Sequence, residues 1–326
     1  MKTFRFLGIA IAALFMTVNF TSCNNEVITP DDQEEKYIEV DLACVGEILD
    51  ITNSPLAKSD EYVDKYHIQV YKLSPMPGSE GSTYYTETGY ARGTFNNSLD
   101  GVKVRLLEGN QYRFKVSIEI DQYLKPEDID VKEFTYTSDI YPYTIPWYNE
   151  GYYGELDRYT PTEGGSVRIE TKRVSYGVKL VAEDLTEGSI SVAVGTSYSG
   201  SSLYNVQLTP VSPVYEHIYS FTNYISAWRG IEIYDSATNT YTYGNYSTKK
   251  YLNVNWTKAD GSVIPLGNFE VTFERNVKTT IRIKAEEAGS SNGITVIKET
   301  NPIVDGDKEY VISGGTVTEV PVNSGN

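Results

Sequence analysis

Strict alternation of apolar and polar residues over 112–120 constrains the fold of this chain more than any other feature. Because successive side chains of a strand point to opposite faces, a period of two predicts a strand with one face on a core and the other in water. Antiparallel sheets allow that arrangement. The apolar positions are Tyr112, Phe114, Val116, Ile118 and Ile120, and the polar positions are Arg113, Lys115, Ser117 and Glu119.

The same period recurs along most of the chain, and helical periodicity is confined to two short stretches, 60–66 and 221–228, which are predicted to be short helices. Residues 107–110 and Arg275–Asn276 lie between consecutive runs and are predicted to form tight turns. The 28 tyrosines, against 10 phenylalanines, also favour pleated strands. Further alternating runs cover 38–42, 66–71, 102–106, 174–180, 190–194, 252–256, 269–273, 277–283, 310–312 and 317–322.

Two series of predicted strands flank a stretch rich in proline and glycine, 121–172. A length of 326 residues corresponds to about two domains. The sequence therefore predicts an all-β protein with two tandem antiparallel β-sandwich domains, residues 37–160 and 166–326. A single large sandwich or a barrel is the alternative.

The N-terminus has the layout of a targeting segment. Lys2 and Arg5 precede an apolar run over 6–18, which is too short to span a bilayer. The following Phe20-Thr-Ser-Cys23 resembles a bacterial lipoprotein signal, which implies cleavage before Cys23 and a diacylglycerol on its thiol. We therefore predict a signal peptide over 1–22, an acidic tether over 23–36, and anchoring at the outer membrane. An ordinary secretory signal is the alternative, and exposure at the cell surface is left open.

Composition and motifs argue against several function classes. A net charge of −16 repels phosphate backbones, so nucleic acid is not expected as a partner. With two histidines and two cysteines, and without a recognised catalytic or phosphate-binding motif, we predict no enzyme, no cofactor and no metal. His67 and His217 are expected to be surface or packing residues, and Cys44 a small core residue. No pair of carboxylates stands out for glycoside hydrolysis, the least favoured function.

Two segments of the second half carry a resemblance to a known family. Lys172–Leu185 and the strand–Arg-Asn–strand pattern over Phe273–Ile283 resemble the fimbrillin-like lipoproteins of Bacteroidales, the major/minor fimbrial subunit superfamily. Such a resemblance implies transthyretin-like, Greek-key sandwiches and a role as a pilus subunit or as an accessory tip or anchor protein. Other pilus subunits are then candidate partners.

Polymerising members of that family lose an N-terminal strand by cleavage after arginine or lysine, which opens a groove for a strand of the next subunit. Here the first arginine after Cys23 is Arg92, so Lys58 is the candidate site of proteolytic maturation. Because this departs from an arginine site, a surface lipoprotein that does not polymerise is the alternative.

Aromatic residues gather in the central stretch and supply the candidate binding residues. In exposed loops such rings can stack on sugars or anchor a protein partner, so a glycan-binding lipoprotein is the second function considered. The competing interpretation is that the rings pack between the domains or across strands. Asp235-Ser236-Ala237 matches a short bacterial O-glycosylation pattern, which makes Ser236 a candidate for modification. The candidate aromatic residues are Tyr141, Tyr143, Trp147, Tyr148, Tyr152 and Tyr153, with a second group at Tyr241, Tyr243, Tyr246 and Tyr251.

Overall fold

The computed structural model describes most of the chain from Lys36 onward. The described residues are 36–46, 63–76, 85–96, 99, 101–121, 133–197, 202–285, 296–302, 308–313 and 316–321. Cys23, Lys58 and the predicted signal peptide lie outside them. Within these ranges the regular structure is almost entirely β-strand, as predicted, with one short helix, α2 (Tyr224–Arg229).

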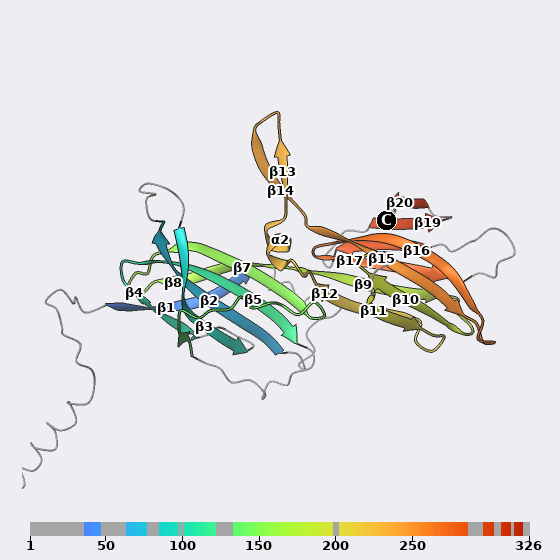
Figure 1. Cartoon of the computed structure of the whole chain (residues 1–326), viewed down its shortest axis with the longest axis horizontal. Helices are drawn as coiled ribbons and strands as arrows, with labels where there is room; N and C mark the ends of the chain where they lie inside the picture. The colour runs from blue at the N-terminus through green and yellow to red at the C-terminus, as the bar shows by residue number, and fades with distance from the viewer. Residues whose placement is uncertain are drawn as a thin grey trace, which may run out of the picture. The chain divides into compact units, whose positions relative to one another are not determined.

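The first sheet contains eight strands from the N-terminal half of the chain (Figure 1). Their order is β4-β1-β8-β7-β5-β2-β3-β6. Strands β7 and β8 pair at only two positions, and the strands on both sides of that junction contribute to one core. The strands are β1 (Tyr37–Gly46), β2 (Val63–Pro75), β3 (Tyr85–Asn96), β4 (Lys103–Leu107), β5 (Gln111–Asp121), β6 (Thr135–Tyr136), β7 (Glu150–Tyr159) and β8 (Ser166–Arg173).

Strand β5 confirms the alternation on its apolar face, because all five predicted core residues are buried. On its polar face, however, Ser117 and Glu119 are also buried, each only 2% exposed. The water-facing prediction is wrong for these two residues. The segment around Tyr143 crosses this face of the sheet, and the Tyr143 hydroxyl donates to Glu119.

The second half of the chain forms two further sheets around a second core (Figure 1). One has the order β11-β10-β15-β16 and the other β12-β9-β17-β18-β19-β20. Strands β13 (Ile231–Asp235) and β14 (Thr240–Gly244) form a separate hairpin. The remaining strands are β9 (Ser175–Glu183), β10 (Ser189–Gly195), β11 (Ser202–Leu208), β12 (Val214–Ser220), β15 (Ser247–Thr257), β16 (Val263–Glu274), β17 (Val277–Lys284), β18 (Val296–Pro302), β19 (Lys308–Ser313) and β20 (Thr316–Pro321).

Among the described residues most of the strand pairs with a known register are antiparallel, as predicted, but two of them are parallel. Strand β1 pairs with β8, and β9 pairs with β17. Both pairs join strands far apart in sequence, so no short turn imposes an antiparallel direction on them.

Local predictions between the strands have mixed outcomes. Arg275–Asn276 forms the predicted turn between β16 and β17, with Asn276 at φ 59°, a conformation that asparagine tolerates. The predicted helix over 221–228 is confirmed as α2. The predicted helix over 60–66 is wrong in its described part, because β2 begins at Val63.

The change from the first sheet to the second group lies later than the predicted boundary at 160–166. Strand β8 belongs to the first sheet, and only Val174 separates it from β9. Residues Ile38–Asn326 belong to one compact unit, so two separately folding domains stay a prediction.

Candidate functional site

The aromatic residues of the central stretch have very different environments. Tyr141 is 70% exposed and Tyr148 is 45% exposed, whereas Tyr152 and Tyr153 are buried on strand β7 rather than placed in a loop. Packing therefore explains Tyr152 and Tyr153, and Tyr141 is the most exposed of the six.

Trp147 is a packing residue of the second core. Its ring stacks on Tyr204 at 6.0 Å and on Tyr219 at 5.7 Å between centroids. Its carbonyl accepts a hydrogen bond from the Ser220 N–H at 2.9 Å. Tyr148 lies edge-on against Trp147, and its carbonyl contacts Nε2 of the half-buried His217 at 2.8 Å.

Tyr152 belongs to a buried ionic network. Arg173, 2% exposed, approaches Glu150 Oε1 at 2.9 Å through Nε, and the same Nε donates to the Tyr152 hydroxyl at 2.9 Å. That hydroxyl in turn donates to Glu150 Oε1 at 2.7 Å. Arg173 Nη1 donates to Asn276 Oδ1 at 2.9 Å, so one guanidinium joins strand β7 to the β16–β17 turn.

Tyr143 is held by a second buried network, on the covered face of β5. Its ring stacks on His67 at 3.4 Å, and its hydroxyl donates to Glu119 Oε2 at 2.5 Å. Lys65 Nζ lies 2.9 Å from the other carboxylate oxygen. Burial alone would raise the pKa of Glu119, but the interactions with His67, Tyr143 and Lys65 outweigh it and lower this pKa to about 2. Glu119 is therefore ionised at neutral pH and fixes the position of Tyr143.

Beside this network lies a hollow of about 420 Å³, here named the Tyr141 hollow. Tyr141 is held at its edge, because Gln69 Nε2 donates to the Tyr141 carbonyl at 2.5 Å. A volume of this size suits a small ligand or one sugar unit. The hollow is lined by His67, Ile68, Gln69, Arg92, Gly93, Thr94, Thr135, Tyr141, Pro142, Tyr143 and Thr144.

Sequence reasoning selected Tyr141 and Tyr143 but missed the polar floor of this hollow. His67 stands opposite Thr94, and Gln69 stands opposite Arg92, in the register of β2 with β3. Alternation does place these residues on the outward face of their strands. The pairing of the two strands, which brings them together, is not visible in the local pattern.

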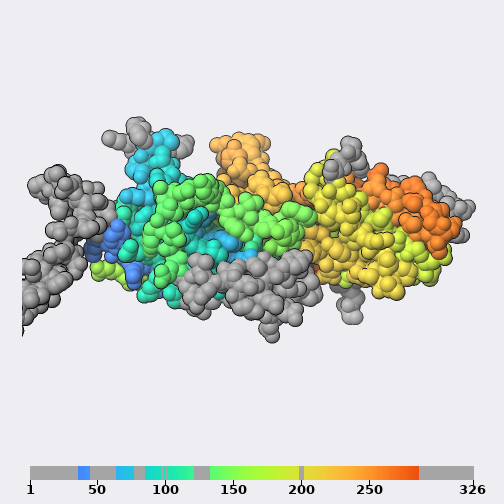
Figure 2. All heavy atoms as spheres, turned by 60° about the horizontal axis from the view of Figure 1, so that its bottom comes forward, coloured from blue at the N-terminus to red at the C-terminus, as the bar shows by residue number. Residues whose placement is uncertain are grey.

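Ser236 lies at the turn of the β13–β14 hairpin, which stands out from the surface around it (Figure 2). It is exposed, as are all residues of 231–243. Asp235 organises the turn, because its Oδ1 accepts from the Ala237 N–H and its Oδ2 from the Thr238 hydroxyl, both at 2.8 Å. These two bonds lower the pKa of Asp235. O-glycosylation of Ser236 stays a prediction.

Cys44 is half-buried against the first core, and burial raises its thiol pKa to about 12, so it is unreactive at neutral pH. Among the described residues, no group of three histidine, cysteine or acidic side chains is placed to hold a metal ion. The helical structure in the same ranges includes nothing long and apolar enough to cross a bilayer.

Comparison with known proteins finds no matching family model and no matching curated protein. Solved structures do resemble the chain. A putative cell adhesion protein from Bacteroides uniformis is 11% identical, with a TM-score of 0.39, over 85% of this chain and 100% of that one. The fimbrial anchor protein Mfa2 from Porphyromonas gingivalis is 10% identical, with a TM-score of 0.36, and the match covers 87% of this chain and 99% of that one. The tip fimbrial protein Mfa3 from the same organism is 12% identical, with a TM-score of 0.33, and the match covers 82% of this chain and 99% of that one. These proteins are of the class that the sequence resembles.

Proposed function

We propose that this chain is a lipid-anchored, non-enzymatic protein of the cell envelope that serves adhesion or pilus assembly. The observation that carries the proposal is the place of strand β1, because a strand that fills a core from the N-terminal end of the chain can be exchanged for the strand of another chain. Anchoring through Cys23 and maturation at Lys58 are part of the proposal.

Strand β1 is a full member of the first core. Ile38, Val40 and Leu42 are at most 5% exposed and lie on one face of the strand. Its backbone lies between β4 on one side and β8, which is parallel to it, on the other. The Leu42 N–H donates to the Val102 carbonyl at 3.1 Å, and Asp41 forms an exposed ion pair with Lys103 of β4 at 3.8 Å. Backbone pairing with alternate apolar side chains is the set of contacts that an incoming strand of the same pattern reproduces.

The test is to release β1 and look for assembly. We expect lysyl endopeptidase to cut the chain that begins at Asn24 after Lys58, and the product to form larger assemblies on size-exclusion chromatography. A synthetic peptide of residues 37–46 in excess should keep the product monomeric, because it occupies the vacated position. The Lys58→Gln variant, treated in the same way, is the control and should stay monomeric.

A role in pilus assembly through strand exchange is wrong if the cut protein loses β1 and remains a monomer. It is equally wrong if the cut protein holds the fragment of residues 37–58 through gel filtration and never assembles. Mass spectrometry of each chromatographic peak distinguishes these two results.

The exposure of Tyr141 beside the Tyr141 hollow favours glycan binding as a second function. On a glycan array, we expect Tyr141→Ala to abolish binding while the melting temperature stays unchanged, because the ring makes few packing contacts at 70% exposure. Tyr148→Ala, an exposed tyrosine outside the hollow, is the matched control and should bind normally. Trp147→Ala is unsuitable because it opens the second core. Equal binding by Tyr141→Ala and the unmodified protein contradicts this function.

A further inference from the structure

The Tyr141 hollow carries a positive charge, although the net charge of the chain is −16. Arg92 is the one lining residue with a permanent charge, and none of the lining residues, all of which lie in the described ranges, is acidic. Arg92 is exposed, and no carboxylate of the described residues lies within ion-pair distance of its guanidinium. The hollow therefore offers an incoming anion a cation that the described part of the protein does not neutralise.

Strand pairing places Arg92 in the middle of the floor of this hollow. It stands opposite Gln69 of β2 on one side and opposite Thr135 of β6 on the other. Opposite residues of antiparallel strands point to the same face of the sheet, so the guanidinium shares its face with an amide and a hydroxyl. Two residues along each strand, the Thr94 hydroxyl lies 3.1 Å from His67 Nδ1. The floor thus combines one arginine with several hydrogen-bonding groups.

Glu119 contacts two residues of the hollow, His67 and Tyr143, but it is not a lining residue. It is 2% exposed, and Lys65 Nζ lies 2.9 Å from its Oε1. Because the lysine compensates the carboxylate at this short distance, the pair exerts only a weak field on a more distant charge. Glu119 therefore does not cancel the attraction of Arg92 for an anion.

Tyr141 supplies a ring beside this cation. It is 70% exposed, and its backbone is fixed because Gln69 Nε2 donates to its carbonyl at 2.5 Å. An exposed tyrosine offers an apolar face to the C–H groups of a sugar, and a guanidinium binds a carboxylate through two parallel hydrogen bonds. A bare inorganic anion would leave the tyrosine unused, and a neutral sugar would leave the arginine unused. One sugar unit with a carboxylate uses both and suits a volume of about 420 Å³.

We propose that the Tyr141 hollow binds a sugar unit that carries a carboxylate, namely a terminal uronic acid, with the carboxylate on Arg92 and the ring against Tyr141. The inference rests on the glycan-binding function proposed above and names the class of glycan. The hydroxyls of Thr94 and Thr135 also line the hollow, and each can donate to or accept from a ring hydroxyl.

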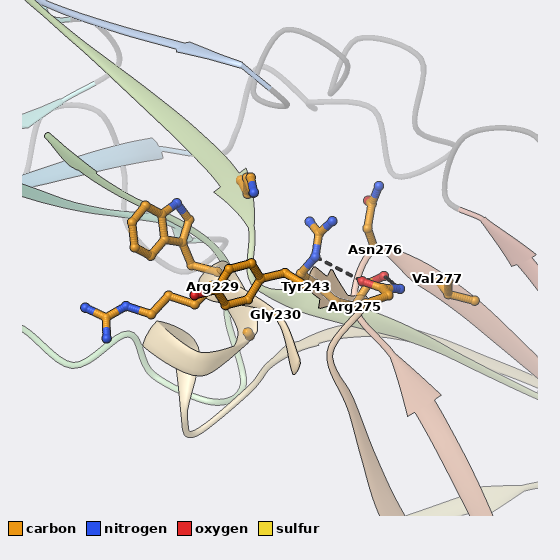
Figure 3. Close-up of a pocket in the computed structure, with 11 residues that line it drawn as sticks. Arg229, Gly230, Tyr243, Arg275, Asn276 and Val277 are labelled. Atoms are coloured by element: carbon orange, nitrogen blue, oxygen red, sulfur yellow. Dashed lines mark hydrogen bonds between the residues drawn. The ribbon is translucent and has the colours of Figure 1, made fainter. Parts of the chain in front are cut away.

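A second hollow provides the control for charge alone. It lies at the base of the β13–β14 hairpin, has a volume of about 360 Å³, and is lined by residues that include Lys172, Tyr243 and Arg275 (Figure 3). Its arginine is already engaged, since Arg275 Nε donates to Asn245 Oδ1 at 3.2 Å. Lys172→Gln removes a positive charge beside a tyrosine there and leaves every lining residue of the Tyr141 hollow in place.

Isothermal titration of the chain that begins at Asn24 tests the proposal with methyl glucuronide and methyl glucoside, which differ only in a carboxylate in place of a hydroxymethyl group. We expect the glucuronide to bind about tenfold more tightly, the usual effect of a hydrogen bond to a charged group. This preference should shrink as salt is raised from about 50 to about 200 mM, because exposed charges are screened.

The variants separate the two parts of the site. Arg92→Gln should abolish the preference for the glucuronide at an unchanged melting temperature, because the side chain is exposed. Tyr141→Ala should weaken the binding of both sugars alike, since both have the ring. Lys172→Gln should keep the full preference.

Equal binding of the two sugars, no binding of the glucuronide at millimolar concentration, or a preference that survives in Arg92→Gln overturns the proposal. Equal or tighter binding of acetate, a carboxylate without a ring, overturns the saccharide assignment. The glycan array distinguishes this failure from failure of the glycan-binding function. Binding that is lost in Tyr141→Ala but unchanged in Arg92→Gln leaves that function in place and refutes the acidic sugar, whereas no binding of any glycan contradicts the function itself.

Discussion

Replacing Arg173 with methionine is expected to lower the free energy of unfolding by about 3–5 kcal/mol, because it leaves the buried partners of a charge without that charge. Glu150 Oε1 then loses the guanidinium that lies 2.9 Å away in the unmodified protein, through Arg173 Nε. Asn276 loses the donor that holds the β16–β17 turn, and Tyr152 loses the donor to its hydroxyl. Loss of both contacts at once affects strands from both halves of the chain.

Thermal and urea unfolding followed by circular dichroism measure this effect, and the melting temperature should fall by about 10 °C. Arg168→Met is the matched control, since Arg168 lies on the same strand with an exposed side chain, and it should change stability by less than about 0.5 kcal/mol. A fall of less than about 1 kcal/mol for Arg173→Met would show that the buried network contributes little.

Phe114→Ala and Phe273→Ala are expected to destabilise different parts of the protein, each by about 3–5 kcal/mol. Phe114 is fully buried in the first core and Phe273 in the second. Removal of a phenyl group leaves a cavity that the neighbouring strands fill only in part, so most of the lost transfer free energy appears as lost stability.

Differential scanning calorimetry of the two variants then tests the division into two domains. We expect two transitions in the unmodified protein, with Phe114→Ala lowering only one and Phe273→Ala only the other. If both variants shift one common transition, the halves unfold as a single cooperative unit and the two-domain prediction is wrong. The Phe→Leu variants at both positions keep most of the volume and should show smaller shifts in the same direction.

The local pattern predicted strands well because alternation reports directly which side of a strand is buried. The runs at 112–120 and 174–180 correspond to β5 and β9, and the Arg275–Asn276 turn corresponds to the β16–β17 connection. The local pattern does not predict which strands pair with each other. The pairing of β1 with β8 joins residues more than 120 positions apart, and nothing in either run specifies that partner or its parallel direction.

Exposure of the aromatic residues was harder to predict, because Tyr141 and Tyr152 lie in one stretch of similar composition. Two glycines could have distinguished the buried Tyr152 from the exposed Tyr141. A Cβ on Gly154 would collide with the Glu170 backbone, and one on Gly151 would lie 2.7 Å from both Ile145 and Ser220. Glycines that flank a tyrosine pair mark a strand under close backbone approach, which identifies Tyr152 and Tyr153 as strand residues. Contacts such as Gln69 with the Tyr141 carbonyl depend on tertiary structure and left no such signal.

The single residue between β8 and β9 has a mechanical consequence. Val174 is buried, its N–H donates to the Gly151 carbonyl at 2.9 Å, and its own carbonyl accepts from the Phe221 N–H at 3.0 Å. When the chain is pulled at its N-terminus, the connection between β8 and β9 therefore has no loose segment that could extend first. Tension must break backbone hydrogen bonds on both sides of Val174 before the polypeptide lengthens there, so this position resists extension instead of acting as an elastic spacer.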